Sequence, residues 1–176
     1  MKELMIDLET LGTGQNSVFL SLAAVQFSLD GRVGAKFYMN IEKESALRAG
    51  LQVDQKTLDW WATQRPEIMA KMFENARPIN MVLAAFREWY KSVGVTRPWG
   101  NSASFDLGIL GNGYNRVGIA QPWALYNEMC FRTIMNLNGG KPTSIIKDNT
   151  KAHDPIYDCE YQIKCLVHAL KGGSAK

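Results

Sequence analysis

The amino-acid sequence predicts an α/β protein, with a mixed sheet of three antiparallel N-terminal strands followed by parallel strands, and with helices packed on the sheet. The first observation is the pair Asp30-Gly31, a strong hairpin signal between two segments rich in apolar residues. The second is that the apolar period then changes from two to about 3.6, and strand-like and helix-like segments alternate. The length of 176 residues fits one domain. We expect a single domain over residues 1–171 and a flexible tail over residues 172–176.

Each expected element follows from its own pattern of apolar residues and turn signals. Strands are predicted over residues 3–9, 17–28, 32–41 and 93–99. Helices are predicted over residues 54–63, 66–73, 79–91, 102–117 and 155–171. The segment 122–138 is ambiguous, and we expect a short helix, a short strand near residues 129–131 and a further helical turn. Its glycines, proline and polar residues predict a loop over residues 139–152.

Composition excludes several classes of protein. The chain is 46% hydrophobic and 21% charged, which is typical of a soluble globular protein. No apolar segment approaches the roughly 20 residues of a membrane helix, so we expect no membrane insertion. Three cysteines without zinc-site spacing, and no secretory segment before them, favour a reducing, cytoplasmic setting. The net charge of +3 is only weak evidence for a polyanionic partner.

The first candidate site is Asp7-Leu8-Glu9-Thr10, at the end of the first predicted strand. Side chains alternate along a strand, so Asp7 and Glu9 project to the same side, about 6.6 Å apart. Two carboxylates on one face form half of a site for a hard cation such as Mg2+. The alternative is an ordinary solvated strand end.

The second candidate is Asp106, in the first turn of the helix predicted after the fourth strand. An apolar stripe follows it on the same helix and faces the sheet. An acid at the upper end of this stripe can reach over the end of the first strand. The alternative is an aspartate that is favoured near a helix N-terminus by the helix dipole.

The third candidate is the pair His153 and Asp158, where the polar loop ends and the last helix begins. A histidine beside carboxylates and metal can act as a general base, because its unperturbed pKa lies near neutral pH. The alternative for a lone histidine is a residue without a catalytic role.

Taken together, these segments resemble motifs I, II and III of the DEDDh exonucleases, the proofreading-exonuclease superfamily with a ribonuclease H-like fold. The sister group with a catalytic tyrosine has it four residues before the last aspartate, where this chain has Asp154. Three further features resemble the compact bacterial and phage exonucleases and exoribonucleases related to the exonuclease VIII domain, and the resemblance spans roughly residues 3–170. They are the segments 57–61 and 99–106, and Gln162.

This resemblance implies a metal-dependent 3′–5′ exonuclease. The substrate would be the 3′ end of single-stranded DNA or RNA, hydrolysed to nucleoside 5′-monophosphates with two Mg2+ or Mn2+ ions. It implies that Asp7 bridges both ions. Glu9 and Asp158 would complete the ligands of the ion on the nucleophile side, and Asp106 would hold the ion on the leaving-group side. His153 would take the proton from the attacking water.

Substrate contacts are expected in two places. By resemblance, Thr10 and Leu11 contact the terminal nucleotide and Phe105 lines the base pocket. Lysines on the loop before His153, with two arginines, could hold phosphates, although such a loop could equally be merely solvated. These basic residues are Lys141, Lys147, Lys151, Arg116 and Arg132. Trp60 and Trp61 are adjacent on a helix, so we expect at least one of them in the core.

Two other functions stay open from the sequence. One is a nucleic-acid-binding module without activity, which would not need all five catalytic residues. The other is a nucleotide or very short oligonucleotide phosphohydrolase that uses the same metals. A homodimer is also open, because exposed aromatic residues can cover a symmetry axis.

Overall fold

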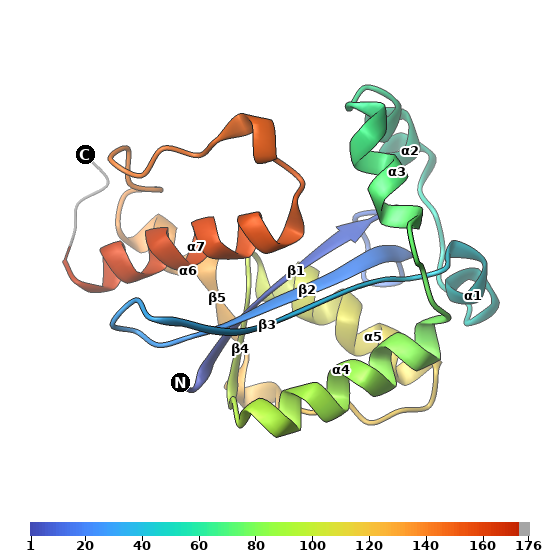
Figure 1. Ribbon diagram of the computed structural model, residues 1–176, viewed down its shortest axis with the longest axis horizontal. Coiled ribbons are helices and arrows are strands. Elements are labelled where there is room, and N and C mark those ends of the chain that lie inside the picture. Colours follow the sequence, from blue (N-terminus) through green and yellow to red (C-terminus); the bar gives the residue numbers. More distant parts are fainter. Residues whose placement is uncertain (173–176) are drawn as a thin grey trace.

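The computed structural model describes residues 1–172 and contains one five-stranded mixed sheet (Figure 1). The strand order is β3-β2-β1-β4-β5. The first three strands pair antiparallel, whereas β4 pairs parallel with β1 and β5 pairs parallel with β4. The predicted fold class is therefore confirmed. The strands are β1 (Glu3–Thr10), β2 (Phe19–Phe27), β3 (Val33–Asn40), β4 (Arg97–Gly100) and β5 (Met129–Cys130).

Helices cover both faces of this sheet. Figure 1 shows α6 and α7 on one side, and α4 and α5 on the other. The helices are α1 (Lys43–Arg48), α2 (Gln55–Ala62), α3 (Pro66–Phe73), α4 (Ile79–Val93), α5 (Gly108–Arg116), α6 (Phe131–Leu137) and α7 (Pro155–Leu170). Shorter turns are a π-helical turn at Ala103–Leu107 and 3-10 turns at Leu125–Asn127 and Asn149–Lys151. Most of the predicted tail, residues 173–176, lies outside the described residues.

The alternation of side chains along β1 separates two hydrophobic cores. Leu4, Ile6 and Leu8 belong to the core beneath α4 and α5. Met5 belongs to the other core, which includes Ile163 of α7. Because Asp7 and Glu9 follow Met5 at steps of two, they lie on the α7 face of the sheet.

The structure departs from the sequence prediction at three elements. The predicted strand over residues 93–99 is wrong at its start, because α4 continues to Val93 and Gly94 ends it in the left-handed conformation, with φ of 65°. The helix α1 was not expected, since only Ser45 and Ala46 of its six residues are buried and no apolar stripe marks it. The helix predicted over residues 102–117 begins instead as the π-helical turn.

The ambiguous segment 122–138 has the three parts that were expected of it. A 3-10 turn, the short strand β5 and the helix α6 follow one another. Residues 139–152 form the predicted loop apart from one 3-10 turn. Within the described residues, no helix has both the length and the apolar character needed to cross a membrane.

Candidate active site

The end of β1 places two carboxylates on one face of the sheet. Asp7 lies opposite Ala23 of β2, and Glu9 lies opposite Ser21. These small neighbours leave room above the sheet for the acidic side chains. A register shift after Glu9 ends the regular pairing, and Glu9 is only 7% exposed. The predicted common face of the two acids is therefore confirmed.

Asp106 reaches the same place from β4. The parallel pairing ends with Gly100 opposite Ile6, so the chain after β4 passes beside Asp7. Asp106 lies in the π-helical turn, 3% exposed, and its Oδ2 accepts a hydrogen bond from the Ser102 amide at 3.2 Å. A Cβ atom on Gly100 would lie 3.0 Å from the Asp106 Cβ, so glycine permits this close approach.

The junction between the polar loop and α7 explains the spacing of five residues between His153 and Asp158. Asp154 caps α7 by accepting a hydrogen bond from the Tyr157 amide at 3.1 Å, and Pro155 begins the helix. His153 has a left-handed backbone, with φ of 64°. Its amide donates to Asp158 Oδ2 at 3.2 Å. The loop is thus tied to the first turn of the helix.

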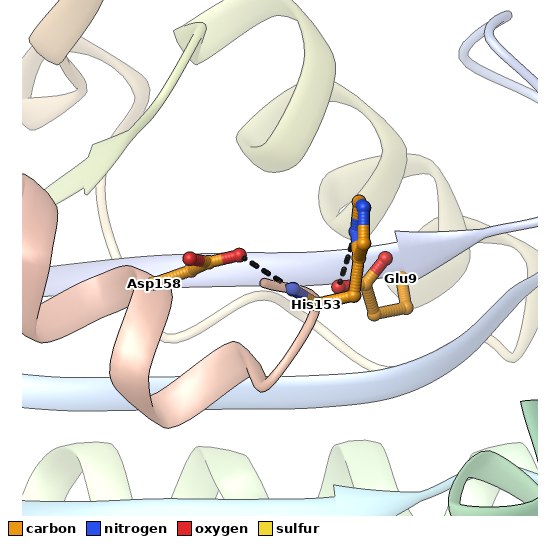
Figure 2. A group of neighbouring side chains, drawn as sticks. All are labelled: Glu9, His153 and Asp158. Carbon is orange, nitrogen blue, oxygen red and sulfur yellow. Dashed lines mark hydrogen bonds and ion pairs between the residues drawn. The ribbon is translucent and has the colours of Figure 1, made fainter. Parts of the chain in front are cut away.

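Residues of the first and third sequence motifs lie side by side in one cluster (Figure 2), and Asp106 of the second motif interacts electrostatically with Asp7. His153 Nδ1 lies 3.6 Å from Glu9 Oε1. One potential ligand atom from each of Glu9, His153 and Asp158 lies within 4.8 Å of the others. Gln162, one turn beyond Asp158 on α7, donates a hydrogen bond to Asp7 Oδ1 at 3.0 Å.

Burial and mutual repulsion dominate the electrostatics of this cluster. Burial, with repulsion from Glu9, Asp106 and Asp158, raises the pKa of Asp7 well above its usual value. Burial also raises the pKa of Glu9, and it raises the pKa of Asp106 to about 7. The neighbouring Glu9 carboxylate raises the pKa of His153. Without a cation, the folded protein thus favours protons on these acids.

The residues fit a divalent metal ion. Carboxylate oxygens are the ligands that Mg2+ and Mn2+ prefer, and four carboxyl groups converge here. Among the lysines and arginines of residues 1–172, Lys147 forms an ion pair with one of these carboxylates, its Nζ lying 2.6 Å from Asp158 Oδ1. One ammonium does not balance four carboxylates, so further positive charge is needed to ionise them all.

The rings of two adjacent tryptophans pack against the ring of His153. Their ring centroids lie 5.3 Å (Trp60) and 5.5 Å (Trp61) from the His153 ring. Trp61 is 3% exposed, and its Nε1 donates to the Thr10 carbonyl at 2.9 Å, which ties α2 to the end of β1. The expectation that at least one of the pair is core is confirmed by Trp61. Trp60 is 44% exposed.

The expected substrate residues near β1 and β4 occupy different environments. The side chains of Thr10 and Leu11 are buried, and Thr10 Oγ1 donates to the Gly12 carbonyl at 2.8 Å. A nucleotide contact from these two residues would therefore come from their backbone. Phe105 is partly exposed beside Asp106.

The expected basic residues do not all converge on the carboxylates. Lys151 is exposed and lies over the Tyr157 ring, and Lys141 lies over Phe131 and Tyr161. Arg116 lies against Gly50. Arg132 is exposed at the start of α6. Lys147 is the member of this set that pairs with a motif carboxylate.

Two contacts of the site escaped prediction from sequence. Gln162 was noted only as part of the family resemblance, although its position four residues after Asp158 places both on one helix face. The pairing of Lys147 with Asp158 depends on the path of an irregular loop, for which the sequence carries no periodic signal.

The raised pKa of Asp106 gives a test of the site without substrate. The group titrates near 3.8 in its unshifted form and near 7 in the folded protein, so folding takes up a proton between these values. The stability of the metal-free protein should therefore fall as pH rises from about 4 to about 7. We expect Asp106→Asn to raise the melting temperature at pH 8 by several degrees, because the amide carries no charge to bury and each kcal/mol is worth about 2–4 °C at this size.

Thermal denaturation in EDTA at pH 5 and pH 8 measures this effect. At pH 5 the difference between Asp106→Asn and the natural chain should be much smaller. Asp59→Asn, at an exposed acid on α2, is the control and should leave both melting temperatures unchanged. If Asp106→Asn melts at or below the temperature of the natural chain at pH 8, the charged, buried Asp106 carboxylate does not destabilise the fold, and the prediction is wrong.

Comparisons with known proteins identify the family of this chain. The model of the family described as "3′–5′ exoribonuclease Rv2179c-like domain" matches residues 2–170. An exodeoxyribonuclease of Enterobacteria phage T4 is 21% identical over 204 residues, covering 97% of this chain and 90% of the phage protein.

Two solved structures of E. coli exonuclease I share the fold. A zinc-bound complex with single-stranded DNA has a TM-score of 0.62 and 15% identity, covering 97% of this chain and 41% of the exonuclease. A complex with a dT13 oligonucleotide has a TM-score of 0.61 and 15% identity, covering 94% of this chain and 40% of the exonuclease. The chain thus spans about two fifths of that enzyme, and the expected ribonuclease H-like fold is confirmed.

Proposed function

Because the chain belongs to the family of 3′–5′ exoribonuclease Rv2179c-like domains and is a DEDD-type 3′–5′ exonuclease, we propose that it hydrolyses single-stranded nucleic acid from the 3′ end to nucleoside 5′-monophosphates with two divalent ions. The observation that carries this proposal is the convergence of Asp7, Glu9, Asp106 and Asp158 with His153 at the end of β1. The family also removes the alternative of a binding module without activity.

Divalent ions, when bound to the four carboxylates, supply Lewis-acid activation of water and neutralise charge on the phosphodiester in the transition state. The roles of the chain's own residues follow from their contacts. Glu9 orients the imidazole of His153 through Nδ1, which leaves Nε2 to take a proton from the attacking water. The acids Asp7 and Asp106 are held by Gln162 and by the Ser102 amide, so their oxygens are positioned in advance.

A cavity beside His153 supports a path for the strand. It has a volume of about 750 Å3 and lies between β3, α3 and the loop that carries His153. Basic side chains in its lining, which fit a phosphate backbone, are Arg65, Lys71, Arg77 and Lys151. The exposed face of Trp60 can stack on a base, an interaction that tolerates any sequence. We propose that Thr10, Leu11 and Phe105 contact the terminal nucleotide at the other end of the site.

The relatives differ in the sugar of their substrate. The family description names an exoribonuclease, whereas the phage relative is an exodeoxyribonuclease and the E. coli structures hold DNA. We therefore propose RNA as a substrate and leave DNA as an outcome of the test.

The proposal is tested with 5′-labelled single-stranded RNA and DNA of equal sequence, incubated with Mg2+, Mn2+ or EDTA and resolved by length. We expect a ladder of RNA that shortens from the 3′ end with metal and is absent in EDTA. A dinucleotide of the same sugar is run in parallel. Cleavage of the dinucleotide without shortening of the longer strands would favour the short-oligonucleotide hydrolase instead.

The expected cytoplasmic setting and the homodimer stay predictions. Cys130, Cys159 and Cys165 are free thiols in the structure. Equilibrium sedimentation measures the oligomeric state directly.

A further inference from the structure

We propose that Lys147 is the resident counter-ion of Asp158 in the metal-free protein, and that a divalent ion must displace its ammonium group in order to bind. The inference rests on the metal site proposed above, and it assigns a competing role to a residue of the His153 loop. Lys147 is a positioning residue here, since it acts through Asp158.

Asp158 is a buried carboxylate with a lysine as its counter-ion. The aspartate is 7% exposed, and each of its oxygens lies close to a group of the segment before α7. Oδ2 accepts the His153 amide at 3.2 Å, and Oδ1 lies 2.6 Å from Lys147 Nζ. A buried carboxylate is costly unless a positive charge pairs with it, and Lys147 supplies that charge.

The ammonium also lies within electrostatic reach of the rest of the cluster. It stabilises the charged form of Glu9 and disfavours the charged form of His153. A divalent ion held by Glu9 and Asp158 would therefore come close to a positive charge that is already in place. Two cations at such short range repel each other strongly in a partly buried site.

The ring of Tyr161 offers a second contact to the Lys147 ammonium. Lys147 Nζ lies 5.7 Å from the centroid of the Tyr161 ring, on the next turn of α7. We expect the ammonium, once displaced from the carboxylate, to keep this contact with the ring, where cation–π attraction stabilises it. Metal binding is thus coupled to the release of one lysine.

The chain offers a matched control on the same loop. Lys141 Nζ lies 5.6 Å from the same Tyr161 ring. Among the residues that the structure describes, no carboxylate lies within ion-pair distance of it. Lys141→Met and Lys147→Met therefore remove the same charge from the same loop and ring, but only the second removes a competitor of the metal. Lys147→Arg keeps the charge.

The experiment measures Mn2+ binding by calorimetry on the full chain, without nucleic acid. We expect Lys147→Met to bind Mn2+ about tenfold more tightly than the natural chain, while Lys141→Met and Lys147→Arg stay within about twofold. In thermal denaturation, Lys147→Met should melt below the natural chain in EDTA. Saturating Mn2+ should then bring the two melting temperatures together.

The outcomes are distinguishable. Equal or weaker Mn2+ binding by Lys147→Met, or a deficit in melting temperature that Mn2+ leaves unchanged, would overturn the displacement of Lys147 and leave the proposed function intact. A natural chain that binds no Mn2+ and hydrolyses RNA equally well in EDTA would overturn both.

Discussion

Replacement of Asp7 by asparagine is expected to lower kcat by at least about a thousandfold, because a site of this type depends on metal charge worth several kcal/mol to the transition state. Asp7 lies at the centre of the cluster, and its carboxylate interacts electrostatically with Glu9, Asp106 and Asp158. Asparagine keeps the volume and the contact with Gln162 but removes the charge. Asp7→Ala should have the same effect on hydrolysis. The measurement is single-turnover cleavage of 5′-labelled RNA with Mg2+.

The control for this prediction is Asp30→Asn. Asp30 lies in the hairpin between β2 and β3, where it pairs with Arg32. Its replacement removes the same charge from the chain far from the cluster in sequence and should leave kcat unchanged. A folded Asp7→Asn protein with more than a tenth of the natural activity would contradict the role of Asp7 as a ligand of the divalent ions.

Replacement of His153 by asparagine is expected to lower kcat by about 10²–10⁴-fold, the usual contribution of a positioned general base. Asparagine is the better variant because it tolerates the left-handed backbone at this position. The backbone N–H of residue 153 can then still donate its hydrogen bond to Asp158. His153→Ala would add backbone strain to the loss of the base. The four carboxylates remain, so Mn2+ binding by calorimetry should stay within about threefold of the natural chain.

The other histidine provides the control for this prediction. His168 lies in the last turn of α7, outside the cluster. His168→Asn should retain natural activity. Loss of Mn2+ binding in His153→Asn in parallel with its activity would contradict the assignment of His153 as base, and would make it a ligand instead.

The motif residues illustrate how much of the site the sequence predicts. Asp7 and Glu9 share a face because the period of a strand is two, and Met5 of the same strand lies on that face in the core. His153 and Asp158 come together because a helix cap and its first turn are local structures. Such features depend on residues close in the chain, so sequence reasoning reaches them.

Other parts of the site depend on pairing between distant segments. Asp106 meets Asp7 only because β4 pairs parallel with β1 and ends level with Ile6. Trp61 reaches the Thr10 carbonyl across 51 positions of sequence. Hydrophobic periodicity identifies a strand or helix but carries no information about which neighbour it pairs with. The helix α1 was missed for a related reason, since its short polar sequence has no apolar stripe.

We propose that four carboxylates at the end of β1 and their neighbours form one centre for two divalent ions. The most direct test is anomalous diffraction from crystals of the natural chain grown with Mn2+. We expect two Mn2+ ions ligated by Asp7, Glu9, Asp106 and Asp158, with Asp7 a ligand of both. Crystals that hold Mn2+ only elsewhere on the molecule, or that show no ion among these four carboxylates at saturating Mn2+, would contradict it.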